Sequence, residues 1–116
     1  MAATNNRKKT TAIPKVGANE MGKLPPQAPE LEESVLGALM IEKDAYASVA
    51  DLLRPESFYM DSNACIFEAI RSLAAQDAPI DLLSVIEQLK SQGNLEKAGG
   101  VLRLSELTRR VASAAH

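Results

Sequence analysis

The sequence is poor in the residues that build most catalytic and metal sites. Its 116 residues include one cysteine and one histidine. A lone Cys65 excludes an intramolecular disulfide, and together with His116 it cannot supply the ligands of a zinc site. His116 is the last residue, so a Ser–His or Cys–His catalytic pair is not expected. Cys65 has apolar neighbours and is predicted to be a small structural side chain. We therefore predict no catalytic residues and no metal or other cofactor within this chain.

Long apolar runs and aromatic side chains are also scarce. No run approaches the roughly 20 residues that span a bilayer, and no apolar stretch follows the basic residues near the N-terminus, as a secretory signal would require. Together with the single cysteine, this predicts a cytoplasmic protein without a membrane partner. Hydrophobic residues make up 46% of the chain but aromatic residues only 3%. The core is therefore expected to consist mostly of Leu, Ile, Val and Ala.

Charge is distributed unevenly along the chain. Residues 1–24 carry five basic side chains and one acidic side chain, a net charge of +4. Residues 25–116 carry 8 basic and 14 acidic side chains, a net charge of −6. The first segment has no apolar periodicity, so we predict a disordered basic leader over 1–24 and a single folded domain over 25–116. An acidic body argues against a surface that wraps DNA.

The leader contains one motif that is similar to a nucleotide-binding loop. The spacing G-x-x-x-x-G-K runs from Gly17 through Gly22 to Lys23. A working P-loop needs a Ser or Thr after the lysine, and a helix that begins at the loop. Leu24 has no hydroxyl, and the two prolines that follow it disfavour a helix there. We therefore reject Gly17, Gly22 and Lys23 as an ATP site.

The first predicted helix begins near Pro29. Proline and acidic residues are typical of a first helical turn, where we expect Glu32 and Glu33 to lie in solvent. Gly37 lies inside this helix and costs about 1 kcal/mol relative to alanine. Two interpretations stay open: a neighbouring helix approaches closely at Gly37, or the glycine is merely tolerated.

Capping residues and apolar spacing predict four more helices. The predicted starts are Asp44, Asp61 or Ser62, Asp81 and the pair Gly99-Gly100, and the predicted stops are Pro55 and Gly93. The stripes expected to face the core are Leu31, Val35, Ala38 and Leu39; Tyr46, Val49, Ala50 and Leu53; Ile66, Phe67, Ile70, Leu73 and Ala74; Leu82, Val85, Ile86 and Leu89; and Val101, Leu104, Leu107 and Val111. Phe58 and Leu95 are expected to insert into the core from turns. No segment alternates with the period of a strand, so the predicted fold class is all-α, a small compact bundle of about five or six helices.

The last two predicted helices allow a test for a DNA-binding helix-turn-helix. A recognition helix presents Arg, Lys, Asn or Gln to the major groove, and the fifth helix offers Arg103, Arg109 and Arg110. Adjacent Arg109 and Arg110 cannot share one face, and Glu106 lies among them. The turn is also longer than the usual 3–4 or so residues. An independent small helical DNA-binding regulator therefore stays an alternative, and a stand-alone enzyme is a third hypothesis.

From residue 25 onward, the order of these signals resembles the N-terminal domain of DnaB-type replicative DNA helicases. In that family a Pro-Pro pair leads into an acidic helix containing Val-Leu-Gly, and a short helix and a Pro-x-x-Phe-Tyr turn follow. The matching positions are Pro25-Pro26, Glu32 to Gly37, Pro55 to Tyr59, Ile66-Phe67, Pro79 to Leu82, Gly99-Gly100 and Ser113 to Ala115. The likeness covers about residues 25–115.

The resemblance implies both a fold and a role. The family's N-terminal domain is a small helical bundle, followed by a helical hairpin, a linker and a RecA-like ATPase domain that unwinds duplex DNA at the replication fork. In the hexameric ring, paired N-terminal domains form a collar that recruits DnaG-type primase. The resemblance therefore implies that this chain is a non-catalytic fragment for self-association and primase recruitment. It also implies that the full-length parent is an ATP-dependent helicase using ATP and Mg²⁺, and that DNA is contacted only through the full-length ring.

Two positions depart from the family pattern. The family commonly has Tyr-Leu after Gly-Gly-x-x, whereas here Arg103 precedes Leu104. We single out Arg103, Leu104 and Leu107 as a candidate partner surface. The usual proline before Ser-Ala-Ala is replaced by Ala112, so the fifth helix is expected to extend further than in relatives. Without the hairpin, self-association of this fragment is expected to weaken.

Overall fold

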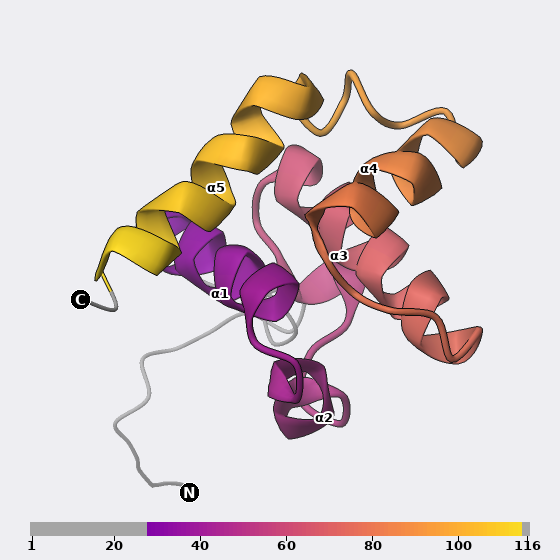
Figure 1. The fold of residues 1–116 in the computed structure, drawn as a ribbon, viewed down its shortest axis with the longest axis horizontal. Helices are drawn as coiled ribbons and strands as arrows, with labels where there is room; N and C mark the ends of the chain where they lie inside the picture. Colours follow the sequence, from indigo (N-terminus) through magenta and orange to yellow (C-terminus); the bar gives the residue numbers. More distant parts are fainter. Residues whose placement is uncertain (1–27, 115–116) are drawn as a thin grey trace, which may run out of the picture.

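The computed structural model describes residues 28–114, which form a bundle of helices (Figure 1). The elements are α1 (Pro29–Ile41), α2 (Ala45–Val49), the 3₁₀ turn η2 (Pro55–Ser57), α3 (Asp61–Ala75), α4 (Leu82–Ser91) and α5 (Gly100–Ala114). The described part of the chain contains no strand, which confirms the predicted all-α class. The predictions for the leader 1–24, for Gly17, Gly22 and Lys23 within it, for the Pro-Pro entry, and for Ala115 and His116 lie outside the described residues.

The helices are arranged as two packed pairs. Figure 1 shows α5 lying along α1 on one side of the molecule and α3 beside α4 on the other. The short α2 follows α1 and projects from the end of the bundle. Within residues 28–114, no helix has the length and apolar character needed to cross a membrane.

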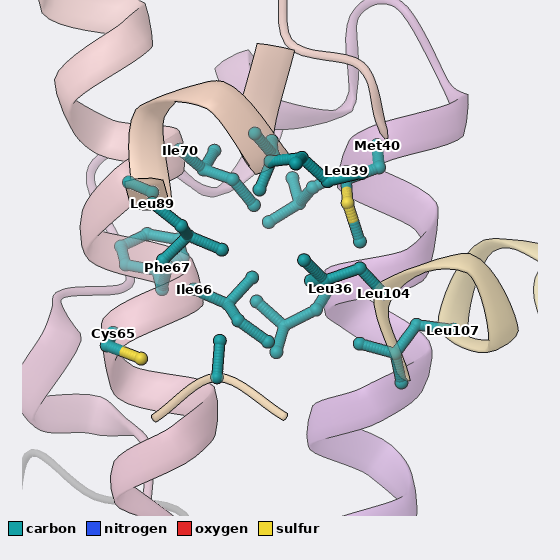
Figure 2. Close-up of a cluster of buried hydrophobic side chains, with 14 of the residues drawn as sticks. Leu36, Leu39, Met40, Cys65, Ile66, Phe67, Ile70, Leu89, Leu104 and Leu107 are labelled. Atoms are coloured by element: carbon teal, nitrogen blue, oxygen red, sulfur yellow. The ribbon is translucent and has the colours of Figure 1, made fainter. Parts of the chain in front are cut away.

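Aliphatic side chains from four of the helices fill the space between the two pairs (Figure 2). Leu36 of α1, Ile66 and Ile70 of α3, Leu89 of α4 and Leu104 of α5 are all fully buried. Two aromatic contacts complete one end of the core, with ring centroids of Phe58 and Phe67 5.1 Å apart and those of Tyr46 and Phe67 6.1 Å apart. The insertion predicted for Phe58 is confirmed, because its side chain is 1% exposed.

Three of the predicted stripes need correction. In α1 the buried face includes Glu32, Leu36 and Met40, whereas Leu31 is 54% exposed. Ala50 lies in solvent just beyond the short α2, and Val101 in the first turn of α5 is 45% exposed. Each stripe was predicted from spacing within one helix, and spacing does not determine which of several partly apolar faces meets the neighbouring helices. The stripe of α4 faces the core as predicted, and so does that of α3 except for Ala74, which is only half-buried and lies outside the core cluster.

The ends of the helices follow the predicted signals only in part. Asp81 caps α4 as predicted, since its Oδ1 accepts the Ser84 amide at 2.8 Å. Gly93, which follows α4, has φ of +74°, the left-handed conformation typical of a glycine stop. The prediction for α3 is wrong: the N-cap position is Met60, and no side chain of its own caps the helix. Asp44 likewise makes no capping hydrogen bond.

Gly37 lies where α1 and α5 approach each other. A Cβ at this position would lie 2.5 Å from the carbonyl oxygen of Leu107 and 2.6 Å from Cγ2 of Val111. Real Cβ atoms do not come this close to other heavy atoms, so only glycine allows the observed packing distance. The first of the two interpretations for Gly37 is therefore confirmed. The last helix, α5, continues past Ala112 to Ala114, and its greater length than in relatives stays a prediction.

Candidate functional site

A buried carboxylate ties the beginning of α1 to the beginning of α3. Glu32 is 0% exposed, which corrects the expectation that it lies in solvent. Its Oε2 accepts the Tyr59 amide at 2.6 Å, and its Oε1 accepts the Met60 amide at 3.4 Å and Nδ2 of Asn63 at 2.8 Å. These donors lie at the amino end of α3, where unpaired N–H groups attract negative charge. Glu32 therefore fixes the two residues that lead into α3, whereas no side chain of the described residues accepts the first-turn amides that Asp61 or Ser62 was predicted to cap.

Arg103 extends this contact to α5. Its Nη2 donates to Oδ1 of the fully buried Asn63 at 2.7 Å and to Oε2 of Glu33 at 3.2 Å. Its Nη1 donates to the carbonyl oxygen of Ala98 at 3.0 Å. One guanidinium thus connects α5 with α3, with α1 and with the turn that precedes α5. This planar group with several fixed donors suits such a junction better than a single ammonium would.

Glu33 is shared between two arginines of α5. Its Oε2 contacts Arg103, and its Oε1 accepts a short hydrogen bond from Nη2 of Arg110. The Glu33 side chain is only 23% exposed, so the expectation of a solvated first turn is wrong here too. Arg103 and Arg110 are two helical turns apart and therefore lie on the same side of α5. We call Glu32, Glu33, Asn63, Arg103 and Arg110 the interhelical network.

The remaining arginine of α5 faces solvent. Arg109 pairs with Glu106 of its own helix at 2.6 Å. This hydrogen bond to Arg109 holds the pKa of the Glu106 carboxyl below its usual range, and it raises the pKa of Arg109. All three arginines that were considered for DNA recognition therefore pair with carboxylates in this structure. Their positive charge is largely compensated before any phosphate approaches.

A groove runs beside the network, between the first turns of α1 and the last turns of α5. Its volume is about 350 Å³. It is lined by Glu30, Glu33, Ser34, Leu107, Arg110, Val111 and Ala114. The carboxylates, the hydroxyl and the guanidinium can fix the orientation of a ligand, and the aliphatic side chains can receive an apolar group. This combination suits the docking of a side chain or helix from a partner.

The structure separates the three residues that the sequence grouped as a partner surface. Leu104 and Leu107 are 0% and 2% exposed and belong to the core, although Leu107 also reaches the groove. The Arg103 side chain is 25% exposed and occupied by the network. These three residues therefore do not form an exposed surface in this fold, and a partner contact through them stays a prediction. Sequence reasoning missed Glu33 and Arg110 as site residues, although the seven-residue spacing of Arg103 and Arg110 was an available signal.

The other candidate residues do not build a chemical site. Cys65 is 7% exposed, and burial raises the pKa of its thiol, as expected for a structural side chain. Among the described residues, no group of three or more His, Cys, Asp or Glu side chains could hold a metal ion. The resemblance assigns ATP and Mg²⁺ to a separate ATPase domain of the full-length parent. The only phosphate-loop spacing, at Gly17 to Lys23, lacks the metal-binding hydroxyl.

Comparison with known sequences gives one consistent result. A family model described as "DnaB-like helicase N terminal domain" matches residues 24–116. The "Replicative DNA helicase DnaB" of Rhodothermus marinus is 50% identical over 97 residues, which are 84% of this chain and 10% of that protein. The protein of the same name from Geobacillus stearothermophilus is 38% identical over 94 residues, which are 81% of this chain and 21% of that protein. The chain therefore spans only about a tenth to a fifth of the length of these relatives.

A solved structure is similar to the bundle in three dimensions. It is the crystal structure of the N-terminal domain of DnaB helicase from Mycobacterium tuberculosis, with a TM-score of 0.69 and 36% sequence identity. The likeness covers 74% of this chain and 60% of that one. The sequence and structure comparisons thus lead to the same family.

Proposed function

This chain belongs to the family of DnaB-like helicase N-terminal domains, and on that premise we propose that residues 25–116 form an assembly and primase-recruiting domain of a hexameric replicative DNA helicase. In this proposal the fragment itself is non-catalytic. The full-length parent unwinds duplex DNA at the replication fork in the cytoplasm, and a separate domain binds ATP and Mg²⁺. DNA is contacted through the full-length ring.

The observation that carries the proposal is the family match over residues 24–116, with relatives that bear the name of a replicative helicase. The match supports the same role for this chain because 50% identity over 97 residues is far beyond what a shared helical pattern alone produces. The proposed mechanism is recognition between preformed helical surfaces rather than chemistry at a reacting atom.

The α1–α5 side of the bundle is the surface that we propose for partner docking. The interhelical network fixes α5 against α1, so the groove between them exists before a partner arrives. A preformed site loses little conformational entropy on binding, and more of the contact energy therefore appears as affinity. Val111 and Ala114 offer apolar contacts, while Glu30 and Arg110 offer charged contacts of opposite sign at the rim.

A matched pair of substitutions tests this assignment. Ser34→Arg places a large charged side chain in the groove, and Ser91→Arg makes the same change at an exposed position of α4. We expect the first variant to weaken binding of DnaG-type primase, measured by fluorescence anisotropy, by at least about tenfold, or about 1.4 kcal/mol. The second variant should bind as the unaltered chain does. Equal affinities would place the primase contact elsewhere.

Self-association is tested separately. Sedimentation velocity of this chain, with and without the helical hairpin that follows it in the family, should show stronger association when the hairpin is present. The assembly role would be contradicted by two results together. The unaltered chain would fail to bind primase, and the longer chain that includes the hairpin would fail to self-associate. Circular dichroism of each variant confirms that a loss of binding does not reflect a loss of fold.

A further inference from the structure

The α2 lobe, which we define as residues 41–56, is the least embedded part of the bundle. None of the residues of α2 is buried. The lobe rests on the core only through half-buried side chains such as Tyr46 and Leu53. Leu52 is 75% exposed and Ile41 is 46% exposed, so apolar surface here faces outward. Figure 1 shows α2 projecting from the bundle at the far end of α1 from the point where the chain enters that helix.

The lobe also carries a net negative charge, and its carboxylates form no ion pairs within the described part of the chain. Its exposed ionisable side chains are Glu42, Lys43, Asp44, Asp51, Arg54 and Glu56, a net charge of −2. None of the four carboxylates forms an ion pair or a side-chain hydrogen bond with another described residue. By contrast, Glu32, Glu33 and Glu106 on α1 and α5 are all bonded. The lobe therefore combines exposed apolar side chains with unpaired acidic ones.

We propose that the basic leader, residues 1–24, docks on the α2 lobe of its own chain. The leader carries a net charge of +4, opposite to that of the lobe. Its apolar residues Ile13 and Val16 flank Lys15, so a short stretch can offer both charge and apolar contact. Such a stretch is complementary to a lobe that exposes both Leu52 and unpaired carboxylates. This inference does not depend on the proposed helicase function.

The length of the chain allows this contact within one molecule. The leader joins the bundle at Pro29, and the lobe begins at the opposite end of the 13-residue α1. At a rise of about 1.5 Å per residue, that helix is roughly 20 Å long. The 13 Cα-to-Cα steps from Lys15 to Ala28 can span up to about 45 Å. Lys15 can therefore reach the lobe along α1 with length to spare, and Arg7 to Lys9 can do so as well.

The proposal is tested by paramagnetic relaxation in the full chain. A spin label is attached at Thr11→Cys in a Cys65→Ala background, and the intensities of the backbone amide signals are recorded at low protein concentration. Outside the leader itself, we expect intensity loss centred on residues 41–56, and recovery of these signals in about 0.5 M salt, where screening weakens charge pairing. A uniform effect, or one centred on the groove between α1 and α5, would overturn the proposal.

Charge-reversal variants separate a specific contact from general attraction. Asp44→Lys combined with Asp51→Lys should abolish the intensity loss in the lobe. Glu87→Lys combined with Glu96→Lys makes the same change in net charge at exposed positions outside the lobe and should leave the loss unchanged. An equal effect of both pairs would contradict docking at this surface.

A mixed sample decides whether the contact is made within one chain. Spin-labelled chains without ¹⁵N are combined with unlabelled ¹⁵N chains, so only contacts between molecules reduce the signals. We expect no intensity loss in the lobe of the ¹⁵N chains. A loss as large as in the singly labelled experiment would show docking between chains and would overturn the proposal.

Discussion

The buried carboxylate of Glu32 stabilises the turn that leads into α3. A carboxylate removed from water is unfavourable unless hydrogen bonds replace its hydration. Here the amides of Tyr59 and Met60 and the side-chain amide of Asn63 provide them. The negative charge of Glu32 also lies near the amino end of α3, where the helix dipole is positive. One side chain of α1 thereby sets the position of α3.

Removal of this carboxylate should strongly destabilise the bundle. Glu32→Ala leaves buried donors unpaired, so we expect the free energy of unfolding to fall by about 2–3 kcal/mol. The matched control is Glu30→Ala, an exposed glutamate in the same helical turn, which should cost less than about 1 kcal/mol. Urea unfolding followed by circular dichroism gives both values. Similar losses in the two variants would contradict the stabilising role of the Glu32 hydrogen bonds.

Cys65 provides a chemical measure of how tightly the core is closed. Burial raises the pKa of its thiol, and the reactive thiolate is therefore rare at neutral pH. We expect thiol reagents to label the native chain at least about 100-fold more slowly than the urea-unfolded chain, equivalent to an opening free energy of about 3 kcal/mol. The raised pKa contributes stability that is present below the thiol's unfolded pKa and is lost as the pH rises through the folded pKa. Equal labelling rates in native and unfolded chains would show that the thiol is accessible.

At the scale of elements, the close approach of α1 and α5 depends on Gly37. In Gly37→Ala the added methyl gains about 1 kcal/mol of helix propensity, but it meets the backbone oxygen of Leu107, which cannot move without shifting α5. Overpacking of this kind costs about 1–3 kcal/mol, so we expect a net loss of stability together with chemical-shift changes at Leu107 and Val111. Gly93→Ala is the control, because it has open space but a left-handed backbone. It should reduce stability without altering the shifts of α5, and unchanged α5 shifts in Gly37→Ala would contradict the predicted clash.

The shared carboxylate of Glu33 should couple the two helices energetically. Glu33 and Arg103 have side chains 23% and 25% exposed, so solvent screens their attraction only in part. A double-mutant cycle with Glu33→Ala and Arg103→Ala should give a coupling energy of about 1–2 kcal/mol in urea unfolding. A second cycle with Glu106→Ala and Arg109→Ala serves as the control. Its ion pair is largely exposed and should give a much smaller coupling, so comparable values in both cycles would contradict the special role of Glu33.

Local patterns predicted the elements better than they predicted how the elements meet. The stripes of α3 and α4 and the cap at Asp81 were predictable because each depends on residues a few positions apart. The face of α1 was not, because the partners of Glu32 lie 27 to 31 residues away in the chain. Arg103 and Glu33 are separated by 70 residues. The candidate site consists of such distant pairs. The seven-residue spacing places Arg103 and Arg110 on one side of α5, but it does not identify Glu33 as their partner.

At the scale of the whole molecule, stability is distributed unevenly between the two ends of α1. At its amino end, the interhelical network joins α1 to α3 and α5. At its carboxyl end, the α2 lobe has no buried residue in its helix and no ion pair among the described residues. Segments with few buried contacts open locally at a lower free energy than the core. The lobe can therefore open locally, or bind another segment, without disturbing the groove between α1 and α5.

Hydrogen exchange measured in the folded chain should resolve this difference. Amides of α3 from Ile66 to Ile70 are surrounded by the core, and we expect them to exchange only through global unfolding, which requires about 5 kcal/mol or more. Amides of α2 should exchange through local opening at less than about half that free energy. Glu32→Ala weakens the network and should lower the protection of α3 while leaving that of α2 nearly unchanged, because local opening of the lobe does not involve the network. Parallel losses of protection in both helices would show that the molecule opens as one cooperative unit, and would contradict the separation of the lobe from the bundle.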